Sequence, residues 1–240
     1  EQQVSTLYRT AFNDIRHYDK WHRTYQLSYQ REDFAFGNEP TTSSNFLIPA
    51  IEWSLIDSAT VQDNRNMIDD GYRLTLSLQG GHDSFLSDTS FISAKVGAKW
   101  IQRLNDNWRM LLRGEVGALT VDDFDLLGPT LRFFAGGDHS VRGYAYQQLG
   151  PKNAEGVVIG GRYLVATSVE FDYAFKPNWR LAVFSDFGNS MMDWDESLKQ
   201  SVGVGVRWIS PIGPIRLDLA AAIDEPGSPW RLHLTLGPDL

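Results

Sequence analysis

The chain has 240 residues, of which 42% are hydrophobic and 22% charged, with a formal net charge of −8 and no cysteine. The hydrophobic content excludes a disordered chain, and the lack of cysteine excludes disulfides, thiolate metal sites and cysteine nucleophiles. Because the basic residues are scattered singly in an acidic chain, we expect no nucleic-acid partner. The sequence shows no leader-like segment and no run of about 20 apolar residues, so we expect neither a signal peptide nor a transmembrane helix.

Apolar residues recur with a period of two along the chain, which predicts strands and not helices. The alternation is clearest in the last third, where Val169 and Phe171 alternate with Glu170 and Asp172. About eleven strands are predicted, each near the ~9–11 residues that a tilted strand needs to cross a bilayer. In chain order they cover 5–15, 23–33, 45–55, 72–79, 90–100, 107–119, 162–175, 178–188, 200–209, 213–221 and 230–237.

The connections between these strands alternate in length. Short ones at 103–107, 176–178 and 210–213 lie at one end, and long ones at 80–88, 121–161, 189–198 and 224–229 lie at the other. This asymmetry is typical of outer-membrane barrels, which have short periplasmic turns and long outer loops. Four tryptophans flank the short connections, as an interfacial girdle would: Trp100, Trp108, Trp179 and Trp208. The predicted fold class is therefore an all-β, antiparallel transmembrane β-barrel.

Two observations leave alternatives open. A soluble β-sandwich has the same alternation, with tryptophan at the end of its core. The polar stretch 57–70 is also expected to be a long loop, although it should lie at the short-turn end.

No enzymatic motif stands out. The five histidines have no metal-ligand spacing, and Asp138, His139 and Ser140 are too close in sequence for a catalytic relay. His233 falls on the polar face of its strand, where we expect a hydrogen-bonded wall residue. The sequence therefore predicts a protein that is not an enzyme, with no catalytic residue, cofactor or metal.

The longest predicted loop contains a glycine-flanked arginine, in the stretch "RFFAGGDHSVRGYAYQQLGP" (132–151). This stretch resembles the loop of the BamA/TamA family of outer-membrane proteins, whose Val-Arg-Gly-Phe/Tyr tip corresponds to Val141, Arg142, Gly143 and Tyr144. Further matches follow in the family's order at 69–81, 168–173, 184–189 and 213–240. The wording "FFAGGDHSVRGY" and the ending "LGPDL" look most like the TamA branch of the family.

The resemblance implies roles for particular residues. The loop tip would fold back into the barrel lumen, where Glu170 and Asp186 would hold Arg142. Gly136 and Gly137 would allow the backbone turns, and the ring of Tyr144 would pack against the lumen wall. The last strand would form one side of a lateral gate, with Trp230, Leu232, Leu234 and Leu236 along it.

Family barrels have sixteen strands, so the resemblance implies that residues 1–240 are the C-terminal portion of a barrel, with a lumen-folded loop at 121–161. About five strands and the periplasmic POTRA domains are expected to precede the chain and to be missing from it.

The function implied by the resemblance is non-enzymatic translocation and assembly in the bacterial outer membrane. Its partners would be unfolded outer-membrane and autotransporter polypeptides, outer-membrane lipid and a periplasm-spanning TamB-type protein. A BamA-like assembly core, a two-partner secretion transporter, a passive pore and an outer-membrane hydrolase remain alternatives.

Overall fold

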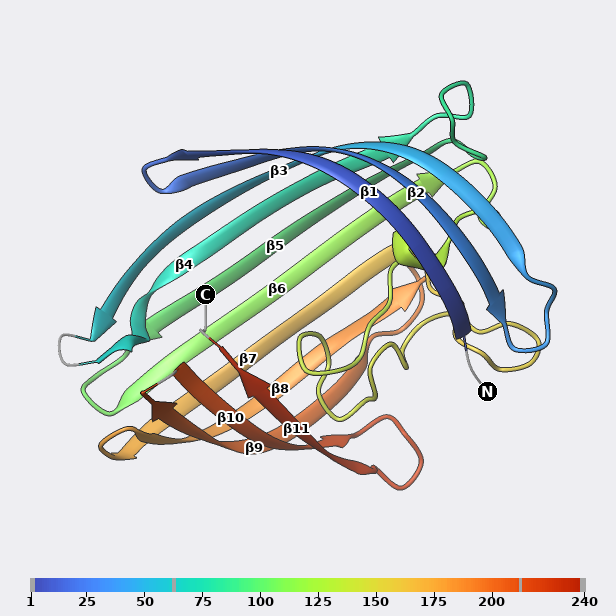
Figure 1. Cartoon of the computed structure of the whole chain (residues 1–240). Coiled ribbons are helices and arrows are strands. Elements are labelled where there is room, and N and C mark those ends of the chain that lie inside the picture. Colours follow the sequence, from blue (N-terminus) through green and yellow to red (C-terminus); the bar gives the residue numbers. More distant parts are fainter. Residues whose placement is uncertain (1–2, 62–63, 212, 238–240) are drawn as a thin grey trace.

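The computed structural model describes residues 3–61, 64–211 and 213–237. Within them the chain forms one antiparallel sheet of eleven strands, each hydrogen-bonded to the next along the sequence. The strands are β1 (Gln3–Tyr18), β2 (Trp21–Phe36), β3 (Thr42–Val61), β4 (Asn64–Gly81), β5 (Phe91–Arg103), β6 (Trp108–Val121), β7 (Tyr163–Lys176), β8 (Trp179–Met191), β9 (Lys199–Ser210), β10 (Gly213–Ala222) and β11 (Trp230–Leu236). The predicted fold class and strand number are confirmed, and Figure 1 shows β4 to β8 running side by side.

Alternation gives the sheet two chemically different faces. Val183 of β8 pairs with Val204 of β9, and these side chains are 52% and 53% exposed on the outer face. The neighbouring positions Ala182 and Phe184 of β8 are buried on the inner face. An apolar outer band around a polar and partly filled interior is the arrangement of a transmembrane barrel.

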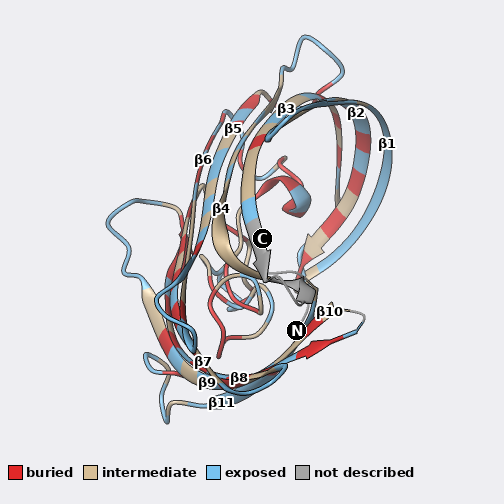
Figure 2. Cartoon of the chain, turned by 90° about the vertical axis from the view of Figure 1, so that its left-hand side faces the viewer, coloured by how far each residue is buried: buried red, intermediate tan, exposed pale blue. Residues whose placement is uncertain are grey.

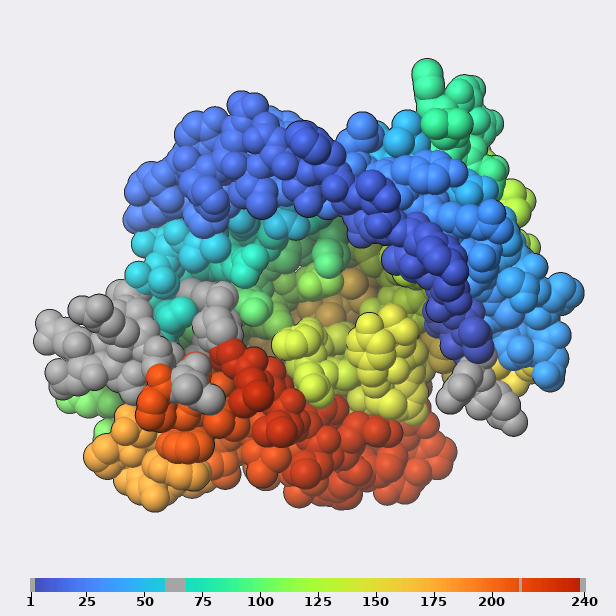
Figure 3. All heavy atoms as spheres, in the orientation of Figure 1, coloured from blue at the N-terminus to red at the C-terminus, as the bar shows by residue number. Residues whose placement is uncertain are grey.

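The sheet curls around the long connection between β6 and β7, residues 122–162 (Figure 2). This connection, hereafter the lumen loop, contains a 3-10 turn, η1 (Pro129–Leu131), and no long regular element. In the space-filling view the lumen loop lies in the hollow between the first strands and the last strands (Figure 3).

The lumen loop fills the interior with apolar side chains. Its first part packs Phe124, Leu127 and Leu131 against inward residues of β3, β5 and β6. Its middle part packs Val141 and Tyr144 against Leu164 of β7 and Ala222 of β10. A buried loop of this size keeps its backbone paired through short bridges, such as Ala135 with Leu149, because unpaired buried amides are costly.

The prediction of a loop at 57–70 is wrong. Strand β3 continues to Val61 and β4 begins at Asn64, so the polar stretch is mostly paired strand; residues 62 and 63 lie outside the described part of the chain. Apolar alternation marks only the part of a strand that lies in lipid, so it does not show how far a hairpin extends beyond it.

The sheet has two edge strands. Among the described residues β1 is hydrogen-bonded only to β2, and β11 only to β10. No helix in the described part of the chain is long and apolar enough to span a membrane.

Candidate functional site

The lumen loop is first shaped by Arg132, which is buried beside η1. Its guanidinium donates hydrogen bonds to the carbonyls of Leu127 (2.7 Å), Phe124 (2.9 Å) and Ile159 (3.0 Å), and so ties the two arms of the loop together. The same guanidinium lies 4.2 Å from the centroid of the Phe124 ring and 4.9 Å from that of Phe36. Carbonyl dipoles and ring faces both favour a cation, which explains how this arginine is accommodated.

The loop tip turns on glycines with positive φ. Gly136 and Gly137 have φ of 99° and 97°, and Gly143 has φ of 94°. A Cβ on Gly143 would also lie 3.1 Å from the backbone of Ala221 and Ala222 in β10. Gly143 therefore allows both the turn and the close approach of the tip to the wall.

Arg142, at the tip, points into a group of carboxylates on three strands. Its Nε and Nη2 donate to the two oxygens of Asp186 on β8, at 2.8 and 2.9 Å. Its Nη1 donates to Glu170 on β7 at 2.8 Å and to Asp218 on β10 at 3.0 Å. The backbone N–H of Arg142 donates to Asp186 as well, at 3.0 Å. The planar five-donor fork of arginine is suited to this arrangement, whereas a lysine ammonium is not.

A second arginine completes the group. Arg207 of β9 donates to Glu170 at 2.8 Å and is also paired with Asp218. Room for this network comes from Gly205, because a Cβ there would lie 1.9 Å from the Asp218 carboxylate. We call Arg142, Glu170, Asp186, Arg207 and Asp218 the anchor cluster.

The electrostatics of the two loop arginines differ. Burial lowers the pKa of Arg132 to about 10, against the opposing charges of Asp125, Glu32 and Glu39. Burial would also lower the pKa of Arg142, but the hydrogen bond and charge of Asp186, with the charges of Glu170 and Asp218, raise it instead. Arg142 also lies 3.3 Å from the centroid of the Phe184 ring. The tip arginine is therefore held as a cation by its surroundings.

The structure brings together the residues that the sequence singled out around Arg142. Glu170 and Asp186 both contact it, and Val141 and Tyr144 are fully buried on either side of the tip. The outer face of β11 carries Trp230, Leu232, Leu234 and Leu236, which are 61–67% exposed.

Sequence reasoning missed Asp218 as a partner of Arg142, and it missed Arg207 as a second arginine bound to Glu170 and Asp218. Asp218 and Arg207 both stand on the polar face of their strands, which was the available signal, but alternation does not show at what height along the barrel each of them lies. Ser168 was missed too: its hydroxyl accepts from Arg142 at 3.1 Å and donates to Asp186 at 2.6 Å. A separate buried group nearer the short turns joins Arg109 and Arg180 to Asp172, with Arg109 at 2.7 Å.

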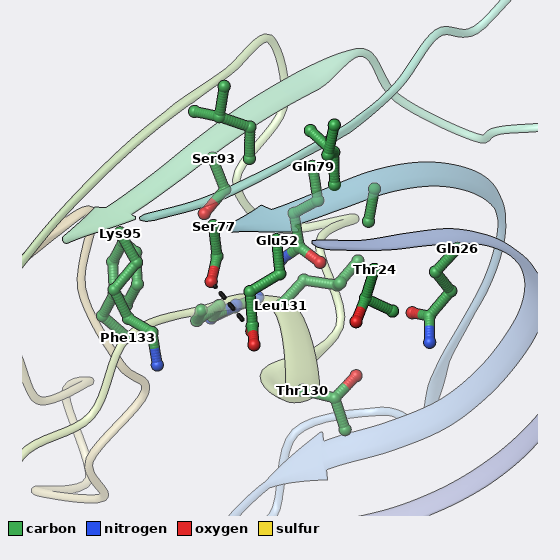
Figure 4. A pocket seen from close by; sticks show the side chains of 14 residues that line it. Thr24, Gln26, Glu52, Ser77, Gln79, Ser93, Lys95, Thr130, Leu131 and Phe133 are labelled. Atoms are coloured by element: carbon green, nitrogen blue, oxygen red, sulfur yellow. Dashed lines mark hydrogen bonds between the residues drawn. The ribbon is translucent and has the colours of Figure 1, made fainter. Parts of the chain in front are cut away.

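The lumen beside the loop is polar. A cavity of about 380 Å³ lies between η1 and the inner face of β2 to β5, and Figure 4 shows Glu52, Ser77 and Lys95 directed into it. Ser77 donates to Glu52 at 3.2 Å across this wall. Hydroxyls, amides and charged groups line the cavity together with apolar side chains such as Leu131 and Phe133. Polar groups of this kind are typical of the interior of an outer-membrane barrel.

The comparisons with known proteins agree with this architecture. The Omp85 superfamily domain matches residues 4–237. The outer membrane protein assembly factor BamA of Nitratidesulfovibrio vulgaris is 37% identical over 102 residues, which cover 39% of this chain and 13% of that protein. The chain thus spans a small part of its curated relative's length. The crystal structure of Haemophilus ducreyi BamA lacking POTRA domains 1–3 superposes with a TM-score of 0.74 at 18% identity, over 98% of this chain and 54% of that one.

The family match covers nearly the whole chain, and the fold is that of the BamA barrel. The chain therefore belongs to the Omp85 superfamily and is a β-barrel protein of the bacterial outer membrane.

Proposed function

We propose that this chain is the C-terminal part of a sixteen-stranded barrel in an outer-membrane translocation and assembly factor of the TamA type. Its role is to help unfolded outer-membrane and autotransporter polypeptides enter the membrane, together with a TamB-type partner. The observation that carries the proposal is the anchor cluster, in which Arg142 at the loop tip is bonded to carboxylates of β7, β8 and β10. Such a cluster fixes a loop inside the lumen and leaves the sheet edge free for clients.

The edge strand β11 supports the same function. An unpaired strand edge in hydrocarbon leaves amides unsatisfied, at a cost of several kcal/mol each. In the intact barrel we expect β11 to pair with the first barrel strand and to exchange that partner for a client strand by β-augmentation.

The proposal is tested in cells that lack the full-length gene. Complementation with the wild-type gene should restore surface display of an autotransporter passenger, and the Arg142→Ala gene should restore much less. Abundance of an unrelated porin serves as the control and should change little. Equal restoration by both genes would refute a role for the anchor cluster, and loss of every barrel protein together would refute the TamA assignment.

A BamA-like general assembly factor is the second candidate, because the curated relative that matches 102 residues is a BamA. The two differ in their expected upstream regions, with three POTRA domains for TamA and five for BamA. The sequence preceding residue 1 in the full gene decides between them.

A further inference from the structure

Within the described part of the chain, strand β11 is attached to the interior through His233. Of its seven residues only His233 is buried, at 5% exposed, and the lipid-facing positions around it are largely exposed. Apart from the ladder to β10, the contacts of His233 therefore decide how firmly β11 is held among the described strands.

Both ring nitrogens of His233 are bonded to the lumen loop. Nε2 accepts the backbone N–H of Gly143 at 2.8 Å, and Nδ1 pairs with the Asp138 carboxylate. An Nε2 that accepts a hydrogen bond carries no proton, so Nδ1 is the protonated nitrogen and donates to Asp138. His233 thus directs one acceptor and one donor at residues on either side of Arg142.

These bonds are separate from those of the anchor cluster. Asp218 lies directly opposite His233 in the β10–β11 pairing, yet its carboxylate binds Arg142 and Arg207. In the anchor cluster, Arg142 bonds the loop tip to β7, β8 and β10. The hydroxyl of Tyr144 donates to the Gln200 carbonyl of β9 at 3.3 Å, and His233 joins the tip to β11. One short stretch of loop is therefore bonded to five successive strands.

We propose that Asp138, Gly143 and His233 form a terminal-strand latch, which holds β11 against the loop tip and which opens when β11 takes up a client strand. The hydrogen bonds of His233 are sufficient to couple the loop to the strand. The opening of the latch during client insertion rests on the proposed function. His233 is a positioning residue in this account, because it acts through the backbone of the loop.

The coupling is tested by hydrogen–deuterium exchange of the full-length protein in lipid nanodiscs. His233→Ala should raise the exchange rate of segment 230–236 by about thirtyfold, the factor expected when two hydrogen bonds of typical net strength are lost. Exchange in β7 and β8 should stay at the wild-type rate, since the anchor cluster is intact. Unchanged exchange in 230–236, or an equal rise in β7 and β8, would overturn the latch.

Matched variants separate the latch from general loss of packing. Thr235→Ala alters the next inward-facing position of β11 and should leave exchange unchanged. His233→Gln should recover most of the protection, because one amide supplies both an acceptor and a donor. Asp138→Ala should raise exchange in the same segment, and the double variant should add little to His233→Ala. A full effect of Thr235→Ala, no recovery by glutamine, or additivity in the double variant would each contradict the proposal.

A second measurement follows the function. The same variants are reconstituted in vesicles, and insertion of an unfolded client barrel is timed. A latch that opens for clients predicts faster insertion with His233→Ala than with wild type; an unchanged rate would overturn its use as a gate. If the wild-type protein inserts no client, the proposed function fails, but the exchange experiment still decides whether the latch exists.

Discussion

Removing the loop-tip arginine tests the anchor cluster directly, and the structure sets the expected size of the effect. In Arg142→Ala, Glu170 and Asp218 keep Arg207 as a partner. Asp186, which is fully buried, loses its bidentate arginine and keeps the Ser168 hydroxyl, the loop backbone N–H and the nearby charge of Arg113. The loss of stability in Arg142→Ala is therefore set by one carboxylate without its arginine, that of Asp186, and not by three. Breaking one side of a buried pair costs about 3–5 kcal/mol.

For a chain of this size the loss corresponds to a drop on the order of 10 °C in the unfolding temperature. The assay is a heat-modifiability gel of the full-length protein, with circular dichroism to follow the strands. Arg142→Lys should fall between wild type and alanine, because an ammonium lacks the planar fork. Asp186→Asn should rescue part of the defect of Arg142→Ala, since it removes the stranded charge. Wild-type heat stability in Arg142→Ala, or strict additivity with Asp186→Asn, would show that the arginine does not act through these acids.

Three further outcomes are expected. Gly143→Ala should destabilise the barrel by about 1–3 kcal/mol in the same gel assay, because φ of 94° and the close β10 backbone both oppose a Cβ; Gly156→Ala, which also has positive φ but meets nothing within 4 Å, is its control. A cysteine at Val169, 40% exposed, should react with a membrane-soluble maleimide, and one at Glu170, 7% exposed, should not; equal labelling would contradict the assignment of faces. Arg132→Met should leave three loop carbonyls without their donor and raise proteolytic cleavage of the loop severalfold, whereas Arg31→Met, at an exposed strand position, should not.

The sequence was enough to predict the number and order of the strands, because alternation reports directly which side chains meet lipid, but it did not show how far β3 and β4 extend. It also indicated which residues face the lumen, since Glu170, Asp186 and Asp218 all occupy the even positions of their strands. It could not give the register between strands, and register decides which lumen residues share one height. The pairing of Asp218 with Gly205, and of Ser168 with Asp186, is what brings these acids to Arg142.

The shape of the lumen loop was also beyond the sequence. Arg132 reads as one more polar residue in a loop, and only the fold shows its three carbonyl partners and the phenylalanine rings beside it. The glycines of "SVGVGVRW" fall on the polar face of the strand predicted at 200–209, but only the fold shows that Gly205 leaves the space into which the Asp218 carboxylate fits. Packing between residues far apart in the sequence determines the contacts of Arg132 and the space at Gly205. Local propensity does not report such packing.

The order of the partners along the chain has a consequence for folding. Arg142 precedes every group that binds it, and its contacts close progressively longer stretches of chain: 28 residues to Glu170, 44 to Asp186 and 76 to Asp218. The link from Gly143 to His233 closes 90 residues. Loop-closure entropy makes contacts between distant residues slow to form. The arginine therefore stays incompletely paired until the final hairpin has docked, so that seating the loop and completing the barrel wall become a single late event.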